Sequence, residues 1–199
     1  MLIAIEGCLG AGKTTVAKGL AAYRNSELLL EEFEKNPFLT AFYEDPVGTA
    51  TETEFSFLML HFHQLKKHSK RLAGTELIAD FHLGKDLIYA DLNLKESRAH
   101  QMFGDLYQFC LEKTTLPSVI IFLTAPTELL LQRIRERNRD FEIDVDSAYY
   151  ASVNTAYEDY FSRHSGTVLR VPMNEWDFVA DPTLYQRLSK MLDRELGLK

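Results

Sequence analysis

The sequence predicts an α/β fold in which a five-stranded, parallel, doubly wound sheet is flanked by helices. Three observations support this prediction. Short apolar runs alternate with longer segments of helical periodicity, an order that gives parallel strands joined by crossover helices. The run at residues 119–123 is apolar throughout, as expected of a strand buried on both faces. A glycine-rich turn also joins the first apolar run to a helical segment.

The apolar pattern places the elements in order. We expect strands at residues 2–5, 28–30, 77–79, 119–123 and 167–171. We expect helices at residues 13–23, 49–71, 83–90, 97–113, 127–135, 146–164 and 181–196. The clearest helical spacing is that of Val16, Ala17, Leu20 and Ala21 in the first helix, and of Phe55, Leu58, Met59, Phe62 and Leu65 in the second. Pro126 suits the start of a helix.

Composition and charge limit the classes of partner. The chain has 199 residues, 46% hydrophobic and 26% charged, which fits one folded domain spanning residues 1–199. A net charge of −7 argues against a nucleic-acid polymer or an anionic membrane as the main partner. We expect no signal peptide and no membrane span, because the apolar runs are short. Two cysteines that look unpaired favour a reducing, cytoplasmic location.

The glycine-rich turn fills every position of the phosphate-binding loop pattern, Gly-x-x-x-x-Gly-Lys-Thr. Its glycines let backbone N–H groups converge on phosphate oxygens, and the helix that follows adds its positive N-terminus. We expect Lys13 to reach the β- and γ-phosphates of ATP and the Thr14 hydroxyl to hold Mg²⁺. The candidate ATP-binding residues are Gly7, Cys8, Leu9, Gly10, Ala11, Gly12, Lys13, Thr14 and Thr15. The Cys8 thiol is not expected to be catalytic, since such a loop works through its backbone.

Carboxylates follow the second and third predicted strands. Glu31 begins an acidic segment, residues 31–34, and Asp80 follows the third strand. Open α/β sheets bind ligands at the carboxyl ends of their strands, so both side chains are candidates for the site. Asp80 suits a Mg²⁺-associated carboxylate. The alternatives are a solvated acidic turn for Glu31 and a helix N-cap for Asp80.

Four arginines fall within seven residues of an otherwise acidic chain, at positions 133, 135, 137 and 139. Guanidinium groups bind phosphate oxygens bidentately, and this segment follows a strand of the same sheet as the phosphate loop. We therefore predict an arginine-rich lid at about residues 133–142 that closes over the triphosphate. The alternative is a solvated basic face.

The ordered set of motifs resembles the deoxynucleoside kinase family, which has a P-loop kinase fold, over nearly the whole chain. The motifs that carry this resemblance are Ile3-x-Ile5-Glu6-Gly7 through Thr15, Glu31, Asn36-Pro37-Phe38 with Phe42-Tyr43-x-x-Pro46, and Arg133-x-x-x-Arg137-x-Arg139-x-x-Glu142. A further segment, Ile78-Ala79-Asp80-Phe81-His82 with Lys85-x-x-Ile88-Tyr89-Ala90, resembles the bacterial branch that contains deoxyguanosine kinases.

The resemblance implies a role for each matching residue. Glu31 matches the catalytic base that takes the proton of the sugar 5′-hydroxyl, and Tyr43 and Glu142 match the residues that hold the 3′-hydroxyl. Asp80 matches the acidic residue at the Mg²⁺ site. The arginines at 133, 137 and 139 match the lid arginines. The family is typically dimeric through a helical interface, which implies a homodimer here.

Two further positions follow from the resemblance. Asp177 and Phe178 match a loop that packs near the ATP base. Many relatives place Arg directly after the strand-end acid, where it orients the 5′-hydroxyl, whereas this chain has Phe81. Either Lys85 or a lid arginine then supplies that charge, or the charge is absent.

Base preference is predicted from the long second helix. In the resembled family, a Gln on this helix reads the Watson–Crick edge of the base. Counting along the helix puts Glu54 at this position, with Glu52 as the fallback and His61 seven residues on. An ionised Glu only accepts hydrogen bonds, and guanine presents two adjacent donors, whereas adenine and cytosine present an acceptor beside the amine. A protonated His61 would donate to guanine O6 or N7, so deoxyguanosine is the predicted substrate; the alternative is that Glu54 is solvated.

Other functions remain open at this point. They are a deoxyadenosine or deoxycytidine kinase, a nucleoside monophosphate kinase and a non-catalytic nucleotide-binding module. A monophosphate kinase needs more basic residues at its acceptor site, and the acidic residues 31–34 argue against it. A regulatory GTPase needs a guanine-reading Asn-Lys-x-Asp, and the nearest string, residues 93–96, does not fit.

Overall fold

The computed structural model describes residues 1–69, 75–95, 97–137 and 146–198. Its centre is a five-stranded sheet of order β2-β3-β1-β4-β5 in which all neighbours are parallel. The strands are β1 (Leu2–Glu6), β2 (Glu27–Leu29), β3 (Leu77–Ala79), β4 (Val119–Thr124) and β5 (Val168–Pro172). The predicted fold class is therefore confirmed. The second strand lies one residue earlier than expected and leaves Leu30 beyond the sheet.

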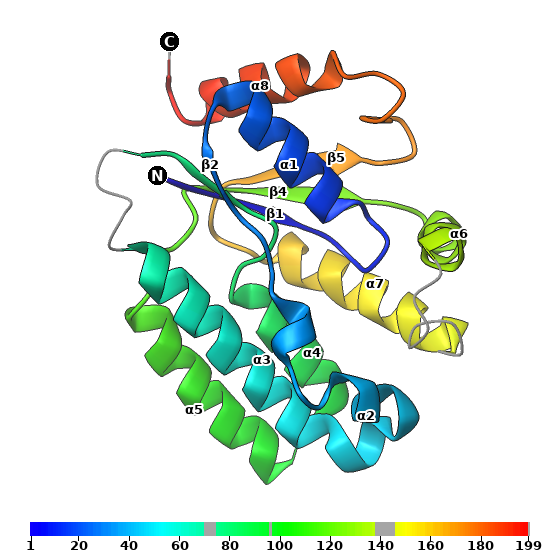
Figure 1. Ribbon diagram of the computed structural model, residues 1–199. Coiled ribbons are helices and arrows are strands. Elements are labelled where there is room, and N and C mark those ends of the chain that lie inside the picture. The colour runs from blue at the N-terminus through cyan, green and yellow to red at the C-terminus, as the bar shows by residue number, and fades with distance from the viewer. Residues whose placement is uncertain (70–74, 96, 138–145, 199) are drawn as a thin grey trace.

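Helices cover both faces of the sheet (Figure 1). Helices α1 (Lys13–Arg24) and α8 (Leu184–Glu195) contact each other on one face, and α4 (Gly84–Asn93) contacts α7 (Ser147–Ser162) on the other. Helix α3 (Pro46–Ser69) packs against α4 and α5 (Arg98–Glu112), and α6 (Thr127–Arg137) follows β4. The connection from β2 to α3 contains a short 3₁₀ helix, η1 (Phe33–Lys35), and α2 (Leu39–Glu44).

Three helix boundaries differ from the sequence prediction by three residues, and the others lie within two. Helix α3 begins at Pro46 instead of residue 49, because proline is tolerated in the first turn of a helix, where its missing N–H is not needed. Helix α4 continues past residue 90 to Asn93. The last helix begins at Leu184 instead of residue 181, because the Asp181 carboxylate accepts the N–H and hydroxyl of Thr183 in a local turn.

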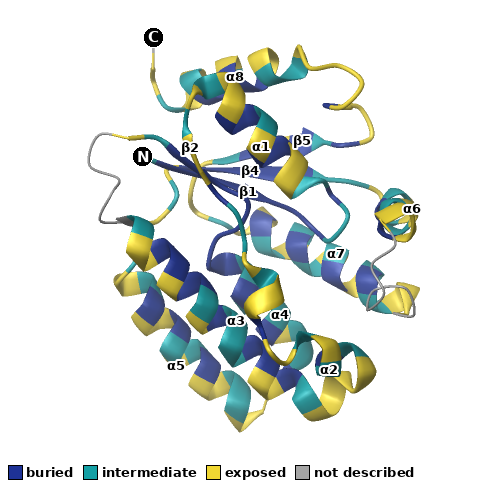
Figure 2. Cartoon of the chain, in the orientation of Figure 1, coloured by how far each residue is buried: buried dark blue, intermediate teal, exposed yellow. Residues whose placement is uncertain are grey.

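The central strands are mostly dark blue in Figure 2, the colour that marks buried residues. Every residue of β1 is buried, and β4 is buried up to Leu123, as expected for parallel strands covered on both faces. At the edge, β2 exposes Glu27 and Leu28. Among the described residues, no helix combines the length and apolar character needed to cross a membrane.

Because the strands are parallel, their carboxyl ends meet along one edge of the sheet. The phosphate loop follows β1, Glu31 follows β2, Asp80 follows β3 and Met173 follows β5. This edge is where the functional site of an open α/β sheet forms.

Candidate active site

A cavity of about 780 Å³ opens at this edge of the sheet. It extends from the phosphate loop, past the ends of β2 and β3, to the helices α3, α4 and α7. Most of the predicted site residues line it: Leu9, Gly10, Gly12, Lys13, Thr14, Thr15, Glu31, Tyr43, Glu54, Asp80, Lys85, Arg133, Arg137, Asp177 and Phe178. A cavity of this size can hold a nucleoside and part of a second ligand.

The phosphate loop takes the conformation that its glycines allow. Gly10 and Gly12 have φ values of 83° and 96°, which glycine adopts without the steric cost that other residues incur. A Cβ on Gly10 would lie 2.8 Å from the carbonyl oxygen of Leu130. Lys13 begins α1 and its Nζ donates to the carbonyl oxygen of Gly7 at 2.7 Å. The lysine therefore lies across its own loop.

Three of the predicted ATP-binding residues do not line the cavity. Gly7, Cys8 and Ala11 are the buried residues of the loop, and Cys8 and Ala11 belong to the hydrophobic core. The carbonyl groups of Gly7 and Cys8 accept hydrogen bonds from Lys13. Burial raises the pKa of the Cys8 thiol to about 11, so the thiol is protonated at neutral pH, as expected for a residue without a chemical role.

Thr14 and Asp80 bring two oxygen atoms together beside the phosphate loop. The Thr14 hydroxyl donates to Oδ2 of Asp80 at 2.6 Å, and Oδ1 of Asp80 accepts the N–H of Glu31 at 2.7 Å. Asp80 is therefore not the N-cap of the following helix, which begins at Gly84. No group of three or more His, Cys, Asp or Glu side chains suited to a metal occurs in the described part of the chain. Mg²⁺ in kinases commonly needs only one or two protein oxygens, since phosphates and water complete its shell, and this pair fits that need.

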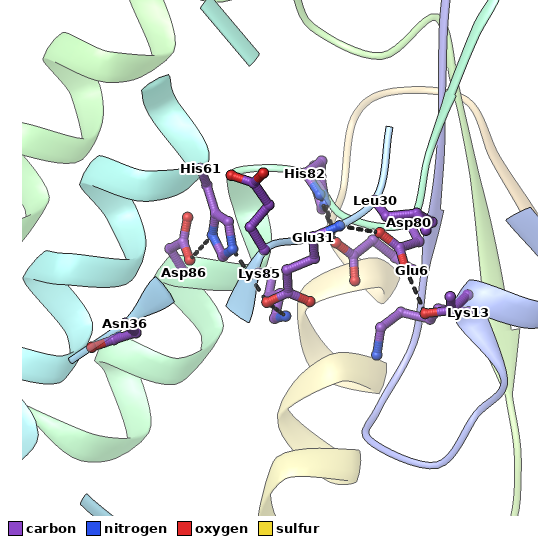
Figure 3. A network of polar contacts seen from close by, with 12 residues as sticks. Glu6, Lys13, Leu30, Glu31, Asn36, His61, Asp80, His82, Lys85 and Asp86 are labelled. Carbon is purple, nitrogen blue, oxygen red and sulfur yellow. Dashed lines mark hydrogen bonds and ion pairs between the residues drawn. The ribbon is translucent and has the colours of Figure 1, made fainter. Parts of the chain in front are cut away.

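Glu31 stands between two cations (Figure 3). Its Oε1 accepts a hydrogen bond from Nζ of Lys85 and lies 3.2 Å from Nε2 of His61. Burial would raise the pKa of Glu31, but the charge of Lys85 and the hydrogen bond from His61 lower it well below its usual range. Glu31 is thus ionised, and Lys85 is a cation in direct contact with it.

His61 does not face the cavity, contrary to the sequence prediction. Its Nδ1 lies 2.7 Å from Oδ1 of Asp86, its Nε2 points at Glu31, and its ring packs against Phe57 and Phe81. Burial opposes protonation, but Asp86 and Glu31 outweigh it and raise the pKa of His61 to about 9. Both ring nitrogens are therefore engaged, and a base in the cavity would meet neither of them.

Glu54 lies in the cavity wall and is not solvated, since only 3% of it is exposed. Its Oε1 accepts a hydrogen bond from Nδ2 of Asn93 at 2.7 Å, and Asn93 in turn pairs with the Tyr149 hydroxyl. Burial raises the pKa of Glu54 to about 8. This pKa contradicts the expectation of an ionised Glu54 at neutral pH, because a carboxyl with a pKa of about 8 is mostly protonated there.

The end of the cavity away from Glu54 is lined by residues from α6 and from the loop after β5. Arg133 and Arg137 face the phosphate loop across this end, and Nη2 of Arg133 donates to the carbonyl oxygen of Met173 at 3.3 Å. The ring of Phe178 is 5.6 Å from that of Trp176. The Asp177 carboxylate accepts the N–H groups of Val179 and Ala180, which fixes the loop.

Two predicted site residues, Arg139 and Glu142, lie outside the described residues, as does half of the predicted lid, residues 138–142. Of the residues assigned to the 3′-hydroxyl, the structure describes Tyr43 alone. Tyr43 lines the cavity from α2, with its ring edge-on to Phe42.

Four residues of the site were missed by sequence reasoning: Asp86, Asn93, Tyr149 and Gln64. Asp86 and Asn93 lie seven residues apart on one face of α4, a spacing that could have been noticed. Tyr149 comes from α7 and is brought to Glu54 only by tertiary packing. Gln64 donates to the carbonyl oxygen of Leu30 at 3.0 Å and supports the segment that carries Glu31.

Comparison with known proteins identifies the family of this chain. The family model described as deoxynucleoside kinase matches residues 3–196. Deoxyguanosine kinase of Bacillus subtilis is 30% identical over 94% of this chain and 93% of its own length, and deoxyadenosine kinase of Dictyostelium discoideum is 29% identical over 97% and 78%. Among solved structures, deoxyadenosine kinase of M. mycoides with bound dCTP has a TM-score of 0.83 at 25% identity, covering 98% of this chain and all of that one.

The fold and the site define a nucleotide-binding phosphotransferase. More particularly, the chain belongs to the deoxynucleoside kinase family. Its relatives divide between deoxyguanosine and deoxyadenosine kinases at similar identities, so family membership alone leaves the base unresolved.

Proposed function

We propose that this kinase transfers the γ-phosphoryl group of ATP to the 5′-hydroxyl of a purine deoxynucleoside and prefers deoxyguanosine. The observation that carries the proposal is the buried Glu54 carboxyl in the wall of the cavity, held by Asn93 at 2.7 Å. The similarity to the deoxyguanosine kinase of Bacillus subtilis supports it.

The phosphate end of the cavity supplies the cations that phosphoryl transfer requires. Lys13 leaves the carbonyl groups of its loop and binds the β- and γ-phosphates, while Arg133 and Arg137 approach from α6. Thr14 and Asp80 would hold Mg²⁺, which neutralises charge that develops on the phosphate oxygens. Negative charge spreads over the γ-phosphoryl oxygens in the transition state, so fixed cations stabilise it more than the ground state.

Glu31 serves as the base for the 5′-hydroxyl. Lys85 neutralises this carboxylate in the structure. When the triphosphate binds, its charge draws Lys85 toward the transferring group, and loss of that contact raises the pKa of Glu31. A carboxylate freed in this way accepts the proton as the hydroxyl attacks.

Deoxyguanosine is preferred because the ionised form of Glu54 accepts from both guanine donors, N1–H and the exocyclic amine. Ionising a carboxyl whose pKa is about 8 costs about 1.4 kcal/mol at pH 7, one unit below that pKa. A buried, mispaired polar edge costs several kcal/mol. Guanine binding therefore repays the ionisation and itself lowers the pKa of Glu54.

A second candidate substrate is deoxyadenosine, and the raised pKa of Glu54 favours it. A protonated carboxyl offers one donor and one acceptor, as the amide of Gln does. That pair matches the amine and N1 of adenine. The two candidates are thus separated by the protonation state of one side chain.

We also propose that the protein is a homodimer, as is typical of the family that it resembles. The outer faces of α3 and α5 carry the exposed apolar residues Met59, Met102 and Phe109, a grouping that favours contact with a second copy. Light scattering on a sizing column should give a dimer for the wild type and a monomer for Phe109→Glu. A monomeric wild type at micromolar concentration contradicts this proposal.

The substrate proposal is tested by incubating the protein with labelled ATP, Mg²⁺ and a panel of acceptors. The panel contains deoxyguanosine, deoxyadenosine, deoxycytidine and deoxyguanosine monophosphate. We expect the highest kcat/KM for deoxyguanosine, a lower value for deoxyadenosine, and no phosphorylation of the monophosphate. A highest value for deoxyadenosine or deoxycytidine overturns the guanine preference, and turnover of the monophosphate alone overturns the nucleoside kinase.

A further inference from the structure

Glu6 is a fully buried carboxylate at the end of β1, directly before the phosphate loop. The reaction described above gives it no role. Acidic side chains are almost never completely buried unless they are paired and hydrogen-bonded. The contacts of Glu6 therefore indicate what it does.

Each oxygen of Glu6 contacts a different segment, and Figure 3 shows the contact with His82. Oε1 accepts the backbone N–H of His82 at 2.8 Å and lies 3.0 Å from Nδ1 of the same residue. Oε2 accepts the N–H of Gly7, the first residue of the phosphate loop, at 3.3 Å. Burial would raise the pKa of Glu6, but the hydrogen bond and charge of His82 lower it below its ordinary value.

The segment held at His82 is the one that carries Asp80 and Lys85. Asp80, two residues before His82, contacts Thr14. Lys85, three residues after His82, contacts Glu31. The segment is closely packed, because a Cβ on Gly84 would lie 2.4 Å from Nε2 of His82. A shift at His82 would consequently reach Lys85.

The two segments that Glu6 joins each carry a lysine of the phosphate-transfer site. Lys13 follows the loop that begins at Gly7, and both Lys13 and Lys85 line the cavity, so the two ammonium groups act on the same region. We propose that the Glu6–His82 pair is a positioning unit that fixes the phosphate loop relative to Lys85 and so keeps both lysines aligned on the transferring phosphoryl group.

A purely structural role for the pair makes a different prediction. Buried ion pairs contribute little net stability compared with apolar residues of similar size, although removing one partner is costly. A structural pair would affect the unfolding temperature and leave kcat per folded molecule unchanged. A positioning pair affects kcat in the folded enzyme, since a displacement of about 1 Å can cost up to about a hundredfold in rate.

The test compares His82→Asn, whose amide can donate from nearly the place of Nδ1, with His82→Leu, which has no side-chain donor. We expect kcat of His82→Leu to fall about tenfold or more with KM for the nucleoside changed less than twofold, and His82→Asn to retain most of kcat. His100→Leu is the matched control, because it removes an exposed pair between His100 and Asp91, 2.7 Å apart and away from the cavity. The kcat of this variant should match that of the wild type.

Several outcomes overturn the proposal. The proposal is overturned if kcat of His82→Leu stays within twofold of the wild-type value. It is also overturned if His82→Leu and His82→Asn lose kcat equally. If His82→Leu does not fold, Glu6→Gln decides, because its amide still accepts from His82 but can no longer accept from both segments. We expect a loss of kcat of about tenfold there too, and an unchanged kcat overturns the proposal.

Discussion

The two ends of the cavity are built in different ways. The proposed phosphate end is built mainly on one continuous segment, residues 7–15, whose glycines give its backbone a tight turn, and α6 adds two arginines. The base end is assembled from single side chains on α3, α4 and α7, namely Glu54, Asn93 and Tyr149. A backbone site recognises what all nucleotides share, whereas side chains on separate helices can change one at a time. Chemistry and specificity are thereby separated within one cavity.

The electrostatics of the two ends differ as well. Lys13 and the arginines of α6 give the phosphate end its positive charge. Where the two ends meet, Glu31 is offset by Lys85. Toward the base, Asp86 is offset by His61, and Glu54 is mostly protonated at neutral pH. Substitutions at the phosphate end should therefore reduce the rate for every substrate, and those at the base end should change the preference between substrates.

The largest loss is expected at the phosphate end. Lys13→Met should reduce both kcat and the affinity for ATP, because Lys13 binds the donor and stabilises the transferring group. Glu31→Gln should lower kcat by about a hundredfold or more while ATP still binds. Steady-state kinetics and ATP titration measure both. Glu34 also lines the cavity, so Glu34→Gln is the control. A fall in kcat for Glu34→Gln, together with a normal kcat for Glu31→Gln, would assign the base to Glu34.

A smaller effect is expected at Lys85, where the two ends meet. Lys85→Met should lower kcat by about tenfold to a hundredfold, the range for one electrostatic contact to the transition state. Lys85 holds the pKa of Glu31 low, so its removal raises that pKa. The acid limb of the kcat/KM profile should then move to higher pH. An acid limb that stays in place would show that Glu31 is not the titrating base.

The smallest effect concerns stability at the base end. The pKa of Glu54 is raised from 4.5 to about 8, so its contribution to stability is complete below about pH 4.5 and is lost as the pH rises through 8. The free energy of unfolding, measured with urea, should fall less between pH 5 and pH 8 for Glu54→Gln than for the wild type. Glu52→Gln, an exposed change on the same helix, should behave as the wild type does; parallel curves for all three would contradict a buried, protonated Glu54.

The sequence was informative wherever a function depends on contiguous residues or strand ends. The phosphate loop followed from its own spacing, and Glu31 and Asp80 from their places after predicted strands. Glu54 was found by counting along a helix, but its charge state depends on burial, which spacing does not reveal. Asn93 and Tyr149 reach it from separate helices. His61 was misjudged because its partner Asp86 lies on another helix.

The most direct test of the account is the ratio of kcat/KM for deoxyguanosine over deoxyadenosine, measured from pH 6 to pH 9 in the wild type, Glu54→Gln and Glu52→Gln. Guanine requires the ionised carboxylate and adenine the protonated acid, so the wild-type ratio should rise with pH toward the pKa of about 8. Glu54→Gln should show a much lower ratio that does not change with pH, and Glu52→Gln should follow the wild type. A wild-type ratio that is independent of pH and unchanged by Glu54→Gln would contradict the assignment of Glu54 as the residue that selects the base.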